Sequence, residues 1–175
     1  MLVVADTSPF IAFLKIAHVD IITNMNNAFQ RHIEALPGLF DELMKMLPMK
    51  ARMVRKPMPA CGVYLFSEGS NHIYVGRTDR MQERLREHCR KGSTHFSASF
   101  AFLLAKDDPT CAEIKGPRAV LEKHEVFGEV FRKAKARVSE MDVRFVRVDD
   151  PYRQALLEIY VSVTLKTPHN SFKTH

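Results

Sequence analysis

Residues 61–89 read C-G-V-Y-L-F-S-E-G-S-N-H-I-Y-V-G-R-T-D-R-M-Q-E-R-L-R-E-H-C and decide the fold. Two short apolar runs, 62–66 and 71–76, lie on either side of the turn-forming stretch S-E-G-S-N. Such runs with a glycine between them predict an antiparallel β-hairpin. Each predicted strand carries a tyrosine near its middle, and in a hairpin Tyr64 and Tyr74 can stand on the same face as neighbours or near-neighbours. A tyrosine on a half-buried sheet is most often a core residue with a hydrogen-bonded tip, so neither one alone indicates a site.

A basic helix is predicted directly after the hairpin. Either residue of the T-D pair at 78–79 can cap it, and it runs to about residue 90. Basic side chains recur at spacings of three and four residues and so share one face: Arg77, Arg80, Arg84 and His88. We expect Met81 and Leu85 on the opposite side, buried against the sheet, with Arg86 and Arg90 on a neighbouring stripe. A row of guanidinium groups can bind successive phosphate oxygens. A basic helix face that is simply exposed to solvent has the same pattern, so the spacing fits both interpretations.

The rest of the chain supplies helices and further strands. Short strands are expected at residues 2–5 and 142–148, and helical segments at residues 10–22, 25–47 (broken near the Pro-Gly pair at 37–38), 96–105, 118–140 and 152–165. The main domain is then an α/β fold of the α+β type, with a small three-stranded antiparallel sheet flanked by helices. Prolines at 48, 57 and 59 bracket a basic linker. The linker separates an N-terminal helical extension, residues 1–59, from the main domain, residues 60–175.

The composition is typical of a globular protein in a reducing compartment. At 175 residues, of which 46% are hydrophobic, the chain can bury a core without a disulfide or metal. Its three cysteines are scattered and lie outside any C-x-x-C spacing, which argues against a zinc site. No apolar run reaches the ~20 residues that span a bilayer, and the N-terminus lacks the basic start of a signal peptide. We therefore expect a cytoplasmic location and no membrane partner.

The net charge of +6 is unevenly distributed along the chain. Residues 1–49 are slightly acidic, whereas positive charge gathers in residues 50–56, 77–91 and 115–137. Such asymmetry favours a polyanionic partner, DNA or RNA. A solvated, solubilising surface is the alternative explanation.

The last predicted helix carries a single carboxylate within its body, Glu158. An acid among apolar neighbours is usually exposed or paired. A lone glutamate can also hold one Mg²⁺, whose remaining positions are filled by waters and phosphate oxygens. Spacing alone leaves both interpretations open.

The triplets G-V-Y at 62–64 and Y-V-G at 74–76 resemble the two signatures of the GIY-YIG nucleases, with Val for Ile in both. The resemblance covers roughly residues 60–175. Four further residues resemble the family's set in the same order along the chain: the helix arginine Arg84, the histidine of restriction-type members His88, the metal-binding glutamate Glu158 and the late supporting asparagine Asn170. No single triplet would be convincing, but the ordered set is specific.

The resemblance implies an endodeoxyribonuclease that hydrolyses DNA phosphodiester bonds with one Mg²⁺ or Mn²⁺ per active site, held by Glu158. Tyr64 would help to deprotonate the attacking water, with His88 as its proton relay, and Tyr74 would orient the nucleophile or the phosphate. Arg84 would stabilise the developing negative charge. Which of Tyr64, Tyr74 and His88 acts as the general base stays open. A free phenol titrates near pH ~10, so Tyr64 needs positive neighbours to act as a base at neutral pH.

The expected partner is DNA, and we predict that Arg77, Arg80 and Lys91 contact it. A homodimer would bring two active sites to the two strands of a duplex, whereas nicking needs only a monomer. The alternatives are a nucleic-acid binding module with a decayed site and an RNA-directed nuclease. Every residue type that phosphodiester hydrolysis requires is present, which speaks against a decayed active site.

The start of the chain shows a second, shorter resemblance. Residues 1–22 resemble the opening strand and helix of PIN-domain ribonucleases, in which Asp6 would match the first metal-binding acid. A PIN site needs several more acids from later strands, and the rest of the chain does not supply them. We interpret this segment as a fragment, a fusion relic or an over-extended start, with Met25 as the hypothetical first residue.

Overall fold

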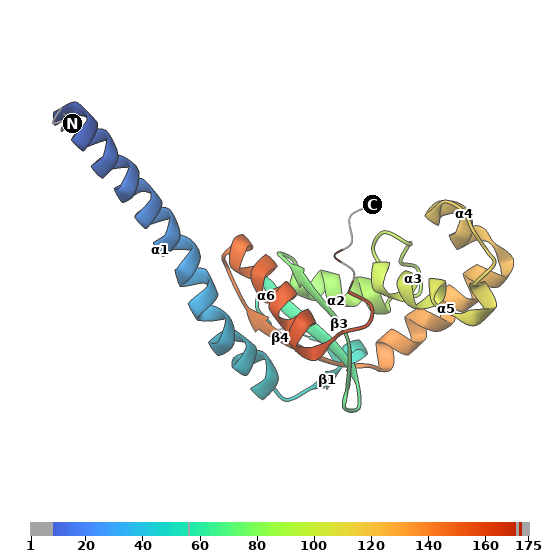
Figure 1. The fold of residues 1–175 in the computed structure, drawn as a ribbon. Coiled ribbons are helices and arrows are strands. Elements are labelled where there is room, and N and C mark those ends of the chain that lie inside the picture. The colour runs from blue at the N-terminus through green and yellow to red at the C-terminus, as the bar shows by residue number, and fades with distance from the viewer. Residues whose placement is uncertain (1–8, 56, 171, 173–175) are drawn as a thin grey trace.

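A four-stranded antiparallel sheet forms the centre of the molecule, with helices on both faces (Figure 1). The structure is a computed structural model that describes residues 9–55, 57–170 and 172. In spatial order, the strands are β1 (Met49–Lys50), β4 (Asp142–Arg147), β2 (Gly62–Glu68) and β3 (Asn71–Thr78). The helices are α1 (Pro9–Lys45), α2 (Met81–Cys89), α3 (Ser99–Lys106), α4 (Arg118–Lys123), α5 (Glu125–Glu140) and α6 (Pro151–Leu165), with short 3-10 turns η1 (Ala51–Met53) and η2 (Pro109–Cys111). The fold class is the predicted α+β class.

The sheet has one strand more than the three that were predicted. In β1, Met49 pairs with Val143 and Lys50 with Asp142, and the Ala51 N–H donates to the carbonyl of Met141 at 2.9 Å. A strand of two residues carries no alternation that a sequence pattern can reveal. It forms because β4 offers a free edge to the chain that passes it.

The central strand β2 is buried on both faces. Val63 and Leu65 pack with α1 and α6, whereas Tyr64 and Phe66 pack on the other face with α2, α3 and α5. All four side chains are at most 1% exposed. Because β2 pairs with β3 and β4 and is covered on both faces, its sequence is continuously apolar instead of alternating.

Helix α1 is continuous where a break near Pro37 was predicted. Leu36 and Leu43, on either side of the proline, are buried in the core shared by α1, α6 and the sheet. Packing of these turns outweighs the local preference of proline to end a helix. The N-terminal half of α1 projects away from the sheet (Figure 1). The strand expected at residues 2–5 lies outside the described residues.

The charged segment predicted as one helix is two helices, α4 and α5. The chain is extended at His124, with φ −66° and ψ 133°. The Nδ1 atom of His124 accepts a hydrogen bond from the Phe127 N–H at 3.4 Å, so the side chain caps α5. Periodicity continues across such a break, and a histidine is not among the residues that usually mark a cap. Within the described residues, none of the helices combines the length and apolar character that crossing a membrane needs.

Candidate active site

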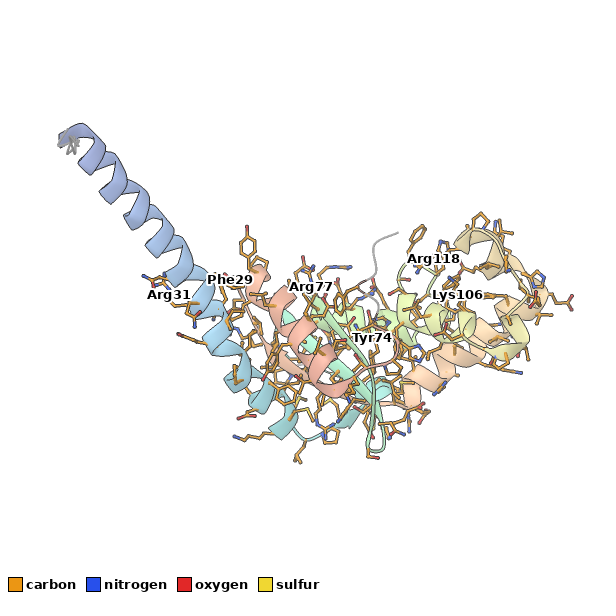
Figure 2. The ribbon with its side chains drawn as sticks, in the orientation of Figure 1. Phe29, Arg31, Tyr74, Arg77, Lys106 and Arg118 are labelled. Atoms are coloured by element: carbon orange, nitrogen blue, oxygen red, sulfur yellow. The ribbon has the colours of Figure 1, made fainter. Side chains whose placement is uncertain are left out.

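The hairpin places Tyr64 and Tyr74 on one face of the sheet, as predicted. In the β2–β3 register Tyr64 lies opposite Gly76 and Tyr74 lies opposite Phe66, so the tyrosines are diagonal neighbours. Their ring centroids are 6.4 Å apart. Tyr64 is 1% exposed, whereas Tyr74 is half-buried and stacks on Phe100 of α3 with ring centroids 4.5 Å apart. Figure 2 labels Tyr74 and, further along β3, Arg77.

The two glycines of the hairpin signatures are needed for different reasons. At Gly76, a Cβ atom would lie 2.5 Å from Tyr64 Oη and 2.6 Å from Tyr64 Cζ. Gly62 has a φ of +148°, which favours glycine, and a Cβ there would overlap the carbonyl oxygen of Val146 on β4. Gly62 therefore allows close pairing of β2 with β4, and Gly76 makes room for the phenol of Tyr64.

Tyr64 and His88 form a buried hydrogen-bonded pair. Tyr64 Oη and His88 Nε2 are 2.9 Å apart, and both side chains are shielded from solvent. Burial, together with the nearby Arg84 guanidinium, lowers the pKa of His88 well below its ordinary value. The imidazole is therefore neutral at neutral pH. Its Nδ1 atom has no partner among the described residues. A neutral imidazole has one nitrogen free to accept a proton, so the pair can pass a proton inward from the phenol.

Burial also controls the two phenols. It raises the pKa of Tyr64, an effect to which the Tyr74 phenol adds and which Arg84 opposes. The pKa of Tyr74 is raised by burial and then by the Glu158 carboxylate, again against Arg84. Desolvation outweighs one guanidinium, so both phenols are protonated in the free protein. The positive neighbours expected to activate Tyr64 do not by themselves produce a phenolate.

Arg84 is held in place by the start of α3. Its Nη1 donates to the carbonyl of Ser97 at 2.7 Å, and its Nη2 donates to Ser99 Oγ at 2.8 Å. The side chain is only 20% exposed. The guanidinium opposes the rise in the pKa of both phenols. Nothing in the sequence pointed to the two serines, because α3 meets α2 only through tertiary packing.

The predicted division of α2 into a basic face and an opposite apolar face is wrong. The side chains that turn inward are Met81, Arg84, Leu85 and His88. These positions are i, i+3, i+4 and i+7, which lie on one side of a helix. The solvent side instead carries Arg86 and Arg90, both of which are more exposed than this inward set.

Glu158 on α6 reaches the same end of the site and is paired with Arg77. The Nε atom of Arg77 donates to Glu158 Oε2 at 3.0 Å. The carboxylate is 19% exposed and the arginine 47%. Burial raises the pKa of Glu158, and Arg77 opposes this effect. Arg77, which was predicted to contact nucleic acid, thus forms an ion pair with the predicted metal ligand.

The donor set suits a hydrated hard cation rather than a cage built by the protein. The described part of the chain contains no group of three or more His, Cys, Asp or Glu side chains that could hold a metal. Mg²⁺ keeps several waters and is typically bound by one or two carboxylates together with substrate phosphates. Glu158, partly exposed and paired with an arginine that is itself half-exposed, fits this mode.

Asn170 binds the outer edge of β3 and so completes the site from the C-terminal side. Its Oδ1 accepts from the Val75 N–H at 2.9 Å, and its Nδ2 donates to the Val75 carbonyl at 2.8 Å. Thr167 Oγ1 lies 2.9 Å from the same Oδ1. The amide thus pairs with the strand residue between Tyr74 and Gly76 as a neighbouring strand would. The supporting role of Thr167 was not predicted, because it depends on the turn that follows α6.

We expect Asn170→Ala to unfold more easily and to lose activity. The change removes both partners of the Val75 backbone and leaves these groups part-buried, which costs about 1–3 kcal/mol. Urea unfolding and plasmid nicking measure the two effects. Asn170→Asp is the control, because its carboxylate still accepts from the N–H but cannot donate to the carbonyl. Wild-type stability of Asn170→Ala would show that the contact to β3 contributes nothing.

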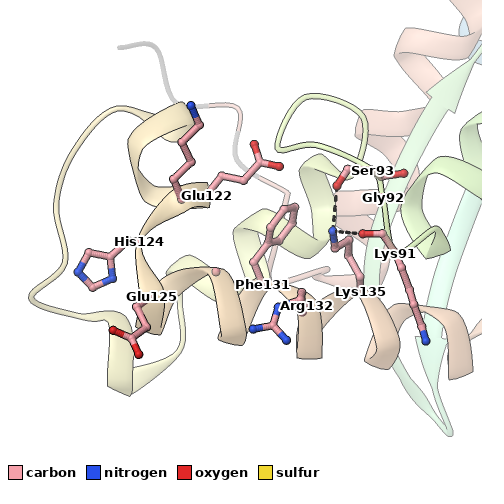
Figure 3. Close-up of a pocket in the computed structure, with 11 residues that line it drawn as sticks. Lys91, Gly92, Ser93, Glu122, His124, Glu125, Phe131, Arg132 and Lys135 are labelled. Carbon is pink, nitrogen blue, oxygen red and sulfur yellow. Dashed lines mark hydrogen bonds between the residues drawn. The ribbon is translucent and has the colours of Figure 1, made fainter.

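The other predicted nucleic-acid contacts lie outside the tyrosine cluster. Arg80 is the N-cap residue of α2 and donates to Glu83 at 2.8 Å. Lys91 is exposed in the loop after α2, beside a pocket of about 440 Å³ between that loop and α5 (Figure 3). The backbone there is fixed by buried Lys135, whose Nζ donates to the carbonyls of Lys91 at 2.6 Å and Ser93 at 2.9 Å.

A family model described as the GIY-YIG catalytic domain matches residues 60–170. Neither a search of curated proteins nor a search of solved structures found a match. The matched segment contains all six predicted site residues: Tyr64, Tyr74, Arg84, His88, Glu158 and Asn170. The match begins well after residues 1–22 and does not separate restriction-type members from others. The PIN-like and restriction-type resemblances are therefore not supported.

Proposed function

The chain belongs to the GIY-YIG family, whose members are nucleases, and we propose that it is a metal-dependent endonuclease that hydrolyses DNA phosphodiester bonds. The observation that carries the proposal is the cluster of Tyr64, Tyr74, Arg84 and His88, with Glu158 close enough to raise the pKa of both phenols. Hydrolysis of a phosphodiester needs a proton acceptor for the attacking water and fixed positive charge for the transition state. This cluster offers both.

Tyr64 and His88 supply the proton path in this mechanism. The attacking water gives a proton to Tyr64 Oη while the phenol passes its own proton to His88 Nε2, 2.9 Å away. The phenol therefore need not ionise beforehand, which agrees with its raised pKa. The lowered pKa of His88 opposes the transfer until negative charge develops on the phosphate. Tyr74, half-buried on the same face, orients the water or the phosphate.

Arg84 stabilises the charge that develops on the phosphate. Its two hydrogen bonds to Ser97 and Ser99 hold the guanidinium before substrate arrives, so little reorganisation is needed. Three of the five guanidinium N–H donors are not used by these two bonds, and one of them can point to a phosphate oxygen. Arginine suits this duty because it stays charged even when partly buried.

Glu158 would hold the divalent cation, one Mg²⁺ or Mn²⁺ per site. When bound, the ion supplies Lewis-acid stabilisation of the phosphate and of the leaving 3′ oxygen. Arg77 pairs with Glu158 in the structure and can exchange that carboxylate for a phosphate oxygen when the substrate is present. Asn170 keeps β3 in position through the Val75 backbone.

Incubation of purified protein with supercoiled plasmid, with Mg²⁺ or with EDTA, tests the function. We expect nicking with Mg²⁺ only, and no comparable cleavage of an RNA of matching sequence. If only the RNA were cleaved, the substrate would be RNA and not DNA. Tight, salt-dependent binding without cleavage of either would indicate a binding module instead. The ratio of nicked to linear product reports whether one strand or both are cut, and hence whether a second active site takes part.

The acid limb of the pH–rate profile should lie above the ordinary titration range of a glutamate. Burial raises the pKa of Glu158, and only the ionised carboxylate binds a cation. As the pH falls through this raised pKa, protonation removes the cation site and the rate drops. Arg77 lowers the pKa of Glu158, so Arg77→Gln should move the acid limb to higher pH. Nicking rates measured from acid to neutral pH test both points, and an acid limb that does not move in Arg77→Gln would contradict the assignment.

A further inference from the structure

Four arginines line a groove of about 460 Å³ on the outer side of α2. Arg52 and Arg55 come from η1 and the residues after it, and Arg86 and Arg90 from α2 and its C-cap. The groove joins two basic stretches, residues 50–56 and 77–91, that are separate in the sequence. None of its lining residues is acidic.

Most of this positive charge has no counter-charge in the protein. Arg52 Nε lies 2.9 Å from Glu140 Oε1. For Arg55, Arg86 and Arg90, no carboxylate lies within 4.0 Å in the part of the chain that the structure describes. The three arginines at positions 77–84 differ, since each of them is ion-paired: Arg77 with Glu158, Arg80 with Glu83 and Arg84 with Glu87.

The groove is separate from the candidate active site but close to it. Arg84 and His88 turn inward from α2, whereas Arg86 and Arg90 turn outward. A helix with its side chains is about 10–12 Å across. One nucleic acid can therefore reach both sides of α2.

We infer that this arginine groove binds phosphate groups of the nucleic acid away from the bond that is cut. Guanidinium groups bind phosphate oxygens in pairs of parallel hydrogen bonds, and a concave surface of one charge sign concentrates the field that attracts a polyanion. Four like charges with a single carboxylate beside them, that of Glu140, repel one another, and a phosphate backbone relieves that repulsion. The inference rests on the proposed function, because it takes the substrate to be a nucleic acid.

The salt dependence of DNA binding tests the groove separately from catalysis. The full-length chain, in EDTA, is titrated with a fluorescent DNA duplex at several salt concentrations, with an RNA duplex as a parallel probe. We expect Arg86→Gln with Arg90→Gln to reduce the slope of log K against log salt by about 2, close to one for each phosphate that is no longer neutralised. Arg55→Gln with Arg90→Gln is a second variant that should act in the same way.

The matched control is Arg132→Gln with Lys133→Gln on α5, where both side chains are exposed and pair with Glu129. It removes the same net charge and should leave the slope nearly unchanged. The inference would be overturned if the groove variants and the control had equal slopes, or if both groove variants kept the wild-type slope. Neither outcome would contradict the nuclease proposal. Absence of DNA and RNA binding by the wild-type chain would overturn the inference, and cleavage measured separately decides whether the proposed function fails with it. Thermal unfolding followed by circular dichroism verifies that each variant is folded.

Discussion

The Arg84→Ala variant is expected to cleave DNA about 10²–10³ times more slowly than the wild-type chain, as when one preorganised donor is removed from a transition-state site. Arg84 lies beside both phenols, and Ser97 and Ser99 fix its direction. A more mobile cation elsewhere in the protein cannot replace a guanidinium that is already held in the direction of the phosphate. Plasmid nicking under single-turnover conditions measures the loss in the chemical step.

Three further variants separate positioning from charge. Arg84→Lys keeps the charge but replaces the planar fork, which donates from two nitrogens to Ser97 and Ser99, with a single nitrogen, so it should remain strongly impaired. Ser99→Ala removes one of the two contacts and should give an intermediate rate. Arg132→Ala, on the exposed part of α5, should cleave at the wild-type rate. An Arg84→Ala variant with wild-type cleavage would remove this residue from the mechanism.

The Gly76→Ala variant is expected to lose about 1–3 kcal/mol of unfolding free energy, as overpacked cores do, together with most of its cleavage activity. The new methyl group would stand 2.5 Å from Tyr64 Oη, so either the phenol or β3 must move. Movement of the phenol breaks its contact with His88, and movement of β3 displaces Tyr74. Urea unfolding and plasmid nicking measure the two effects.

A second glycine provides the matched control for Gly76. Gly38 lies inside α1, and a Cβ atom there would meet nothing within 4 Å. Gly38→Ala should therefore raise the unfolding free energy by about 0.5–1 kcal/mol, because alanine favours a helix interior, and leave cleavage unchanged. If Gly76→Ala behaved like Gly38→Ala, the room left for Tyr64 would not be the reason for a glycine in the second triplet.

The hairpin and its two tyrosines could be predicted because their signals are local. Regular pairing from the turn would set Tyr74 opposite Leu65, on the face away from Tyr64. The register shift between Phe66 and Ser67 sets Tyr74 opposite Phe66 instead, which brings both tyrosines to one face.

The inward set of α2 also has a helical spacing in the sequence, but the spacing does not indicate which face is buried, and basic side chains are seldom buried. Arg84 and His88 depart from the usual exposure of polar side chains. Such departures are typical of active sites, where polar groups are buried for their chemistry.

Elements that depend on distant partners could not be predicted. The strand β1 exists because β4 has a free edge, and α1 continues through Pro37 because Leu36 and Leu43 are buried. The split between α4 and α5 at His124 likewise follows no periodic signal. In the first two cases a contact between segments far apart in sequence decides a local conformation.

The sequence by itself determined which chemical groups are present, and its ordered motifs indicated the family. It also determined that each strand of a hairpin carries one phenol, because the two apolar runs and the turn between them are local signals. Only the tertiary structure decided how those groups behave. Burial under α2 and α3 keeps the phenols protonated and His88 neutral, and Ser97 and Ser99 aim Arg84. Desolvation and hydrogen-bond direction depend on every element packed around a group, so no stretch of sequence contains them.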